Sequence, residues 1–400
     1  MKNIAIIGGG PSGLFAAEVA AKLGAKVDLY DAMPSVGRKF LVAGKSGLNL
    51  THDEPIEPFL KRYSGNGLPE LLWREIIESF DNHALRKWAS DLGIETFVAS
   101  SGKVFPSPDE GSIKAAPLLR SWIKSLRDLG VTFHTRHKWT AFKKPNQLTF
   151  VHQGKEISVT PDATILALGG ASWPQTGSTA SWVNILNEHD ISSTPLCSAN
   201  CGWEVAWPAP ILEEAEGLPL KNLSVSSGES SRHGELVITR DGLEGGPLYH
   251  LGPHIRQQQA AHITIDFKPS LGHTELVTRM GKVKRNFVRE ARRRWNLDPA
   301  SCSILKHMPE RGPWQSVEQL AREVKNCYIP LTGPRPIAEA ISSAGGICWE
   351  EINDSLMLKK IPHVYVAGEM MDWEAPTGGY LLQACFATAA HAAKHAIHAE

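Results

Sequence analysis

Residues 2–13 read KNIAIIGGGPSG and join an apolar run to a turn with three spaced glycines. This spacing, between a strand and a helix, is typical of a site for a dinucleotide pyrophosphate. The first glycine permits the tight turn, the second lets the backbone approach the phosphates, and the third lets the helix pack closely on the strand. The start of the helix adds backbone amides and a positive dipole. We therefore predict that the pyrophosphate is bound by Gly8, Gly10, Pro11, Ser12 and Gly13.

The sequence that follows this turn supports the same interpretation. Residues 14–23 have a helical pattern, and residues 25–30 read as a second strand that ends at Asp31. This acid lies about 20 residues after the glycines, where a carboxylate would bind the ribose hydroxyls of an adenosine. A glycine turn without a ligand is the alternative, and the strand, helix and acid around it argue against that alternative.

Length and composition limit the classes of protein to which the chain can belong. The chain has 400 residues, enough for two or three domains, and its 42 basic residues balance 42 acidic ones. A neutral chain binds nucleic acid or a membrane surface only through a local charged patch. No stretch approaches the roughly 20 apolar residues of a membrane span, and the N-terminal apolar run is too short for a signal peptide. We therefore expect a cytoplasmic protein without a membrane partner.

The cysteines give no sign of a metal or redox centre. Cys197 and Cys201 form the only close pair, and a lone pair of this spacing favours two reduced thiols. We predict no metal site. The six cysteines are Cys197, Cys201, Cys302, Cys327, Cys348 and Cys385.

Changes in composition predict the domain organisation. Residues 163–168 form an apolar strand that stops at two glycines and belongs with the first two strands in one sheet. From Pro195 to about residue 265, short strands broken by Gly, Pro and Ser indicate a small β domain, and residues 271–325 turn helical. We predict a first domain at 1–194 and 336–400, a β-rich insertion at 195–270 and 326–335, and a helical insertion at 271–325.

A cluster of positive charge lies within the predicted helical insertion. Between Arg279 and Arg294 there are eight Lys or Arg residues and a single acid, Glu290. On one continuous helix, an apolar stripe would lie opposite a basic stripe. The basic stripe is either a solvated face or an anion-binding face, with RNA as the obvious polyanion. The apolar stripe comprises Met280, Val283, Phe287, Ala291 and Trp295, and the basic one Lys282, Arg285, Arg289 and Arg293.

The C-terminal part of the chain contains a second glycine-led helix start. Residues 361–369 read as a strand that ends in a turn, Asp372 follows, and residues 376–380 open a final helix that runs through Ala399. Two such starts at opposite ends of the chain indicate one composite site for a long ligand. One half would hold an ADP moiety and the other half a flavin.

Short motifs along almost the whole chain resemble those of the HI0933-like NAD(P)/FAD-dependent oxidoreductases of the YhiN/BaiN type. The C-terminal motif is the most specific, and the middle of the chain matches most loosely. The motifs are Gly8-x-Gly10-x-x-Gly13, Gly37-Arg38-Lys39, Asn49-Leu50-Thr51, Ala167-Leu168-Gly169-Gly170, Gly234-Glu235-Leu236-Val237-Ile238-Thr239 with Gly242-Leu243, and Ala367-Gly368-Glu369 with Asp372 and Thr377-Gly378-Gly379-Tyr380.

The resemblance implies an α/β fold of the two-dinucleotide-binding-domain type, in which a β-barrel-like domain with a helical insertion interrupts a Rossmann-type FAD domain. It implies non-covalent FAD, with Asp31 on the adenosine ribose and Asp372 on a ribityl hydroxyl. The amides of Gly378, Gly379 and Tyr380 would face the pyrimidine edge of the flavin and, with the helix dipole, stabilise the charge of its reduced form. The other cofactor-binding residues that it implies are Arg38, Lys39, Asn49, Leu50, Gly169, Gly368, Glu369 and Thr377.

Two departures from the family pattern concern the flavin surroundings. Residues 46–49 read Ser-Gly-Leu-Asn where the family commonly has Gly-Arg-Cys-Asn, so no cysteine acid or redox partner is available there. Leu381 stands where an asparagine is usual, which removes one hydrogen bond to the flavin. These changes leave FAD binding untouched, but the family's substrate and mechanism cannot be assigned to this chain from the resemblance alone.

Lys45 and His52 are the candidates for acid/base catalysis, because both lie on the loop that should border the flavin. Histidine titrates near neutral pH, and a lysine becomes a usable acid or base when its ammonium group is desolvated. Simple phosphate or surface contacts are the alternative for both residues.

The function implied by the resemblance is hydride transfer between flavin N5 and a substrate. No second complete glycine fingerprint is present, so NAD(P)H would act as a diffusible donor. A small-molecule substrate would be an amine to oxidise or an unsaturated carbon bond to reduce. A second hypothesis is structured RNA, because members of this family are linked to dihydrouridine formation in ribosomal RNA, and the basic 279–294 helix would hold phosphates. A flavin-binding regulatory protein without turnover is the third.

Overall fold

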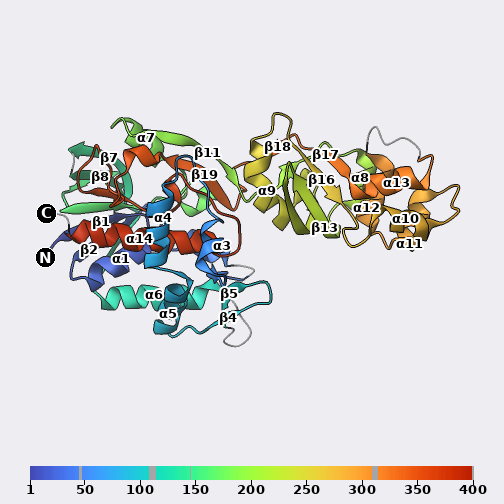
Figure 1. Cartoon of the computed structure of the whole chain (residues 1–400). Coiled ribbons are helices and arrows are strands. Elements are labelled where there is room, and N and C mark those ends of the chain that lie inside the picture. The colour runs from blue at the N-terminus through green and yellow to red at the C-terminus, as the bar shows by residue number, and fades with distance from the viewer. Residues whose placement is uncertain (45–46, 108–113, 145, 309–313, 399–400) are drawn as a thin grey trace. The chain divides into compact units, whose positions relative to one another are not determined.

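The computed structural model describes residues 1–44, 47–107, 114–144, 146–308 and 314–398 (Figure 1). The chain divides into two compact units. Unit 1 comprises Met1–Cys197 and Ile341–Glu400, so both ends of the chain contribute to it. Unit 2 is the intervening segment Ser198–Ala340.

A five-stranded parallel sheet forms the centre of unit 1. Its strands are short and apolar, and the last one comes from the C-terminal segment. Because all the strands run parallel, their carboxyl ends meet at one edge, where ligands bind in open α/β sheets. In spatial order the strands are β20 (Val364–Val366), β10 (Ala163–Leu166), β1 (Asn3–Ile7), β2 (Lys26–Asp31) and β6 (Thr132–Thr135).

Two helices from opposite ends of the chain pack against each other in unit 1. Figure 1 shows α14 (Tyr380–His398), in red, running beside α1 (Pro11–Lys22), in blue. Both are rich in alanine, which permits close helix packing. This pairing brings the N-terminal glycine turn and the C-terminal motif into one unit.

Smaller elements complete unit 1. One three-stranded antiparallel sheet has the order β7-β8-β9, another has the order β3-β5-β4, and β11 pairs with β19. Their bounds are β3 (Thr51–His52), β4 (Thr96–Val98), β5 (Lys103–Pro106), β7 (Lys138–Lys144), β8 (Gln147–His152), β9 (Lys155–Val159), β11 (Ser193–Ala199) and β19 (Ser342–Ile347). The helices are α2 (Arg38–Ala43), α3 (Ile56–Leu60), α4 (Glu70–Ser79), α5 (Asn82–Asp91), α6 (Ala115–Asp128) and α7 (Trp182–Asn187).

A buried carboxylate lies in the core beside α1. Glu18 is 1% exposed, and its Oε2 accepts hydrogen bonds from the indole nitrogens of Trp88 (3.0 Å) and Trp122 (2.7 Å). Its Oε1 accepts one from Lys22, at 2.6 Å. The carboxylate therefore satisfies two buried N–H groups that have no water to bind.

Glu18→Ala should lower the free energy of unfolding by about 2–6 kcal/mol, because it leaves both indole N–H groups unsatisfied at about 1–3 kcal/mol each. Lys87→Met is the control: the side chains of Lys87 and Asp91 are 74% and 61% exposed, so losing their ion pair should cost under about 1 kcal/mol. Guanidinium-induced unfolding measures both. Equal midpoints for the two variants would show that Glu18 has no such role.

Unit 2 is built on a seven-stranded antiparallel sheet with six helices among its described residues. In spatial order the strands are β17 (Cys327–Pro330), β16 (His262–Asp266), β13 (Pro219–Ser227), β14 (Ser230–Ile238), β15 (Gly242–Glu244), β12 (Trp203–Glu204) and β18 (Gly333–Pro334). The helices are α8 (Ala209–Ala215), α9 (Gly246–Arg256), α10 (His273–Met280), α11 (Phe287–Arg294), α12 (Pro299–His307) and α13 (Val317–Lys325). One continuous apolar core lies within the unit.

The prediction of one basic helix over 279–294 is wrong. Helix α10 ends at Met280, and α11 begins at Phe287. Gly281 and Asn286 both have positive φ, of 59° and 55°, which no α-helix accommodates. The expected apolar residues are nevertheless buried or partly buried, and the basic side chains are exposed. Charge and apolar spacing thus predicted the exposed and buried sides, but not the break in the helix.

Candidate functional site

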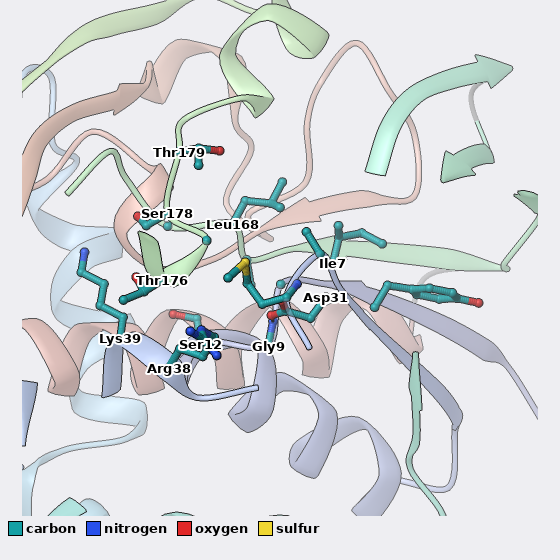
Figure 2. Close-up of a pocket in the computed structure, with 18 of the residues that line it drawn as sticks. Ile7, Gly9, Ser12, Asp31, Arg38, Lys39, Leu168, Thr176, Ser178 and Thr179 are labelled. Carbon is teal, nitrogen blue, oxygen red and sulfur yellow. The ribbon is translucent and has the colours of Figure 1, made fainter. Parts of the chain in front are cut away.

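A pocket of about 400 Å³ lies at the carboxyl ends of β1, β2 and β10. This size suits a small-molecule ligand. Figure 2 shows Gly9, Ser12 and Arg38 on one side, with Leu168, Ser178 and Thr179 across from them. Of the residues predicted from the sequence, those that line the pocket are Gly8, Gly10, Pro11, Ser12, Asp31, Arg38, Lys39, Gly169 and Glu369.

The three glycines of the first turn have different surroundings. Gly8 has φ of 107°, and a Cβ atom there would overlap the carbonyl oxygen of Ala167. A Cβ atom on Gly13 would overlap the carbonyl oxygen of Gly8, so the helix can approach the strand only without a side chain. A Cβ atom on Gly10 would meet nothing within 4 Å. Gly8 and Gly13 therefore keep the turn compact, while Gly10 leaves space at the pocket wall.

Asp31 ends β2 and fixes the glycine turn through its side chain. Its Oδ2 accepts a hydrogen bond from the backbone N–H of Gly9, and its Oδ1 accepts one from that of Met33, both at 2.7 Å. Burial raises the pKa of the carboxyl group, although the two backbone hydrogen bonds and the charge of Arg38 oppose the rise. Each oxygen has a further lone pair, so the carboxylate can also accept ligand hydroxyls.

Arg38 and Lys39 are neighbours in sequence, but their charges are differently engaged. The Nζ of Lys39 donates to Glu369 Oε2 at 2.8 Å and to Ser172 Oγ at 2.6 Å, so an acid from the other end of the chain pairs with it. The Nε of Arg38 is buried and has no hydrogen-bond partner among the described residues. The Nη1 of Arg38 donates only to Ser35 Oγ, at 3.4 Å. Arg38 therefore keeps more donors for an anion than Lys39, whose ammonium group is paired with an acid.

Segments that sequence reasoning did not nominate form the opposite wall. The region after β10 contributes Pro174, Thr176, Gly177, Ser178 and Thr179, and His137 to Trp139 contribute a further edge. The run of Gly, Ser and Thr after a strand is a signal that could have indicated this loop. Residues 137–139 carried no comparable signal.

The C-terminal motif lies close to the first turn through Gly368. Its φ is 79°, and a Cβ atom there would overlap the hydroxyl oxygen of Ser12. Asp372 is 3% exposed and does not line the pocket; its Oδ2 accepts a hydrogen bond from Thr194 Oγ1 at 2.5 Å. Burial raises the pKa of this carboxyl group, which the bond from Thr194 partly opposes. A contact of Asp372 with a ligand stays a prediction.

The start of α14 meets strand β3 at Gly378 and Gly379. Gly379 has φ of 96°, and a Cβ atom there would overlap the backbone of Thr51. The hydroxyl of Thr51 donates to Gln383 Oε1 at 2.8 Å. Loop residues 49–52 and the C-terminal glycines are thus in direct contact, although none of them lines the pocket described above.

The remaining nominated residues lie on or near this contact. The ring of His52 stacks on that of Tyr380 with centroids 5.3 Å apart, and its Nε2 lies 3.1 Å from the carbonyl oxygen of Ser101. A carbonyl only accepts, so Nε2 carries the proton. The Nδ1 of His52 and the Oδ1 of Asn49 are buried and have no partner among the described residues. Leu50 is fully buried, Thr377 is half-buried, and Lys45 lies outside the described residues.

The described parts of the chain contain no group of three or more His, Cys, Asp or Glu side chains arranged to hold a metal ion. Nor do they include a helix with the length and apolar character to cross a membrane.

The chain matches a known family over almost its whole length. The model of the family described as HI0933-like protein Rossmann domain matches residues 2–395. The chain belongs to this family. The expected family and the Rossmann-type α/β fold are thereby confirmed.

Among characterised relatives, the HI0933-like chain is 26% identical to a 3-dehydro-bile acid delta(4,6)-reductase from Clostridium scindens, over 97% of both chains. It is 22% identical to a ribosomal RNA dihydrouridine synthase from Escherichia coli, over 96% of this chain and 95% of the relative. A solved 3-ketosteroid-delta4-(5alpha)-dehydrogenase from Rhodococcus jostii RHA1 superposes with a TM-score of 0.55 at 14% identity, covering 100% of this chain and 97% of that one. The similarity to the solved dehydrogenase shows the fold alone. The similarity to the bile acid reductase agrees with the expected oxidoreductase class.

Proposed function

We propose that the chain binds FAD non-covalently and is an FAD-dependent oxidoreductase that reduces a carbon–carbon double bond conjugated to a carbonyl group. The observation that supports FAD is the pocket at the sheet edge, where Gly10 leaves open space and the buried Nε of Arg38 has no partner. These are the features that a pyrophosphate requires: close backbone approach and a cation with an unpartnered donor. The pyrophosphate of FAD would lie there, with its adenosine ribose at Asp31.

The flavin half of FAD would extend toward the contact between Gly378–Gly379 and the loop at 49–52. The helix start at Tyr380 supplies amides and a positive dipole, which favour the negative charge of a reduced flavin. FAD when bound supplies hydride transfer at its N5 atom, and the protein supplies orientation and electrostatics. The unpartnered Nδ1 of His52 and the amine of Lys45 are our candidates for moving the accompanying proton.

The substrate class is supported by the name of the bile acid reductase, whose substrate carries a ketone conjugated to double bonds. NAD(P)H would be a transient donor at the flavin face. The test begins with the spectrum of the purified protein, which should be yellow and release one FAD per chain on denaturation. Anaerobic stopped-flow should then show flavin reduction by NADH or NADPH, followed by reoxidation with conjugated enones.

Two outcomes would contradict this function. A colourless protein that cannot be reconstituted with FAD would remove the cofactor. Reduced flavin that no enone, amine-derived imine, RNA or oxygen reoxidises would favour a regulatory flavin-binding protein instead. An amine oxidase would be recognised by flavin reduction with amines in the absence of NAD(P)H.

Structured RNA is a second candidate substrate, because unit 2 exposes a cluster of cations that lack acidic partners. Arg293 and Arg294 bind Glu290, and Arg279 binds Glu275. No ion pair with an acid in the described residues involves Lys282, Lys284, Arg285, Arg289 or Arg292. The likeness to a ribosomal RNA dihydrouridine synthase also favours this candidate.

If RNA is the substrate, its affinity should fall steeply with salt, because phosphate binding releases counterions. Replacing Lys282, Arg285 and Arg289 with glutamine should lower the affinity for RNA about 10-fold or more. It should also reduce the slope of log affinity against log salt concentration by about 3. The control removes three exposed charges from unit 1, with Lys87, Lys124 and Lys143 changed to glutamine. Absent binding, or equal losses in both variants, would exclude this role of the cluster.

We also propose the finer organisation of the middle of the chain. Its sheet strands would form a barrel-like domain over 195–270 and 326–335, and residues 271–325 would be a helical insertion into it. The four helices α10 to α13, which fall between strands β16 and β17, support this division.

A further inference from the structure

Tyr380, the first residue of α14, is held at both its side chain and its backbone. Its phenol donates a hydrogen bond to Glu54 Oε1 at 2.7 Å. Its backbone carbonyl accepts a hydrogen bond from the phenol of Tyr63 at 2.9 Å. Tyr380 is 3% exposed and Tyr63 is 7% exposed; the hydrogen bond from Tyr63 is buried, and the one to Glu54 is partly buried.

An arginine completes this group of residues. The Nε and Nη2 atoms of Arg62 donate to the two carboxylate oxygens of Glu54, at 3.0 and 2.8 Å. The guanidinium carbon of Arg62 lies 5.8 Å from the centroid of the Tyr380 ring, within cation–π range. We call Glu54, Arg62, Tyr63 and Tyr380 the tyrosine clamp.

The charges of the clamp balance one another. Burial tends to raise the pKa of Glu54, but the hydrogen bonds from Arg62 and Tyr380 outweigh it and lower the pKa. Burial and the neighbouring Glu54 raise the pKa of the Tyr380 phenol, which stays protonated as a donor. The pair of Glu54 and Arg62 therefore holds the phenol without adding net charge near the helix start.

Two consecutive glycines explain why this helix start needs external support. Gly378 and Gly379 have φ of 134° and 96°, and Gly379 packs directly on the backbone of Thr51. Glycine is the most flexible residue in an unfolded or loosened segment. The hydrogen bonds on Tyr380 fix the residue that follows this flexible pair, and with it the direction of the first N–H groups of α14, which have no partner within the helix.

We propose that the tyrosine clamp positions the N-terminal turn of α14 against the flavin and so sets the reduction potential of bound FAD. This inference rests on the proposed function. Glu54, Arg62 and Tyr63 act as positioning residues through Tyr380. A fixed array of amides stabilises the negative charge of reduced flavin better than a mobile array, because it needs no reorganisation when the charge forms.

The test compares Tyr63→Phe and Tyr380→Phe with Tyr365→Phe. Each substitution removes one phenol hydroxyl, and the phenol of Tyr365 donates to a carbonyl of the same helix at its other end, His395 O, at 3.5 Å. After loading with FAD, the midpoint potential is measured against reference dyes. The two clamp variants should favour oxidised flavin about tenfold, a shift of about 30 mV to more negative potential for two electrons. Tyr365→Phe should keep the wild-type potential.

The outcomes separate this inference from the proposed function. Wild-type protein that cannot be loaded with FAD would refute both. The clamp alone would be refuted if the FAD-loaded clamp variants kept the wild-type ratio of oxidised to reduced flavin, at the same applied potential, within twofold. Should Tyr380→Phe fail to fold, Tyr63→Phe decides the matter, because its ring can still pack on Trp73 and Trp373.

Discussion

Gly10→Val protein should fold like the wild type but purify without FAD. A Cβ atom at Gly10 would meet no atom within 4 Å, so we expect the protein without ligand to accept the valine. That room is part of the pocket wall, where the pyrophosphate of FAD would have to approach the backbone. The branched side chain takes this space, and we expect FAD affinity to fall by at least about 1,000-fold, which corresponds to about 4 kcal/mol.

Gly272→Val is a matched control for this prediction. Gly272 precedes α10 with φ of −74° and ψ of 158°, Gly10 precedes α1 with φ of −78° and ψ of −176°, and both have open space. The two substitutions therefore cost similar helix-capping energy. FAD content per chain and thermal unfolding are measured for both. Normal FAD content in Gly10→Val would show that the glycine turn does not hold the cofactor.

The steric roles of Gly8, Gly10 and Gly13 could be predicted from the sequence because they depend on local backbone geometry. A strand, a tight turn and a helix leave no room for a side chain at Gly8 or Gly13, whatever the rest of the chain does. The sequence also indicated a glycine-led helix start at Gly378 and Gly379, but not the close approach of Gly379 to Thr51. Sequence reasoning works well where steric exclusion between neighbours decides the structure.

Side-chain partners between distant segments could not be predicted in this way. Lys39 and Glu369 were each nominated for the cofactor, yet they pair with each other across 330 positions of sequence. Only the placement of β20 beside β10 brings that acid to the pocket. The break between α10 and α11 was missed for a related reason, because charge spacing does not show where Gly281 ends the helix.

Asp31→Asn should lower FAD affinity about 100-fold. The carboxylate accepts backbone hydrogen bonds on both oxygens, from Gly9 and Met33. An asparagine has one oxygen and one NH₂ group, so one of these N–H donors would face another donor. The substitution loses that bond and weakens the ribose contact, and hydrogen bonds to a charged group contribute about 1.5–3 kcal/mol each. Asp28→Asn is the control, because Asp28 lies on the same strand, binds His134 at 2.7 Å and does not line the pocket.

The pH dependence of FAD affinity distinguishes a ligand contact of Asp31 from a simple loss of folding, because the two effects change with pH in opposite directions. Burial raises the pKa of Asp31 above its ordinary value of 3.8 in the folded protein. The folded protein without FAD therefore binds the proton of Asp31 more tightly than the unfolded chain does. The contribution of Asp31 to the free energy of unfolding is full below pH 3.8 and is lost as the pH rises through the pKa that Asp31 has in the folded protein. FAD affinity should change in the opposite direction, because protonation removes a charged acceptor, and it should fall as pH drops through the same window.

Fluorescence titration with FAD across that range should show the fall in wild type and in Asp28→Asn but not in Asp31→Asn. An equal pH dependence in Asp31→Asn would assign the effect to another group and remove Asp31 from the ribose site.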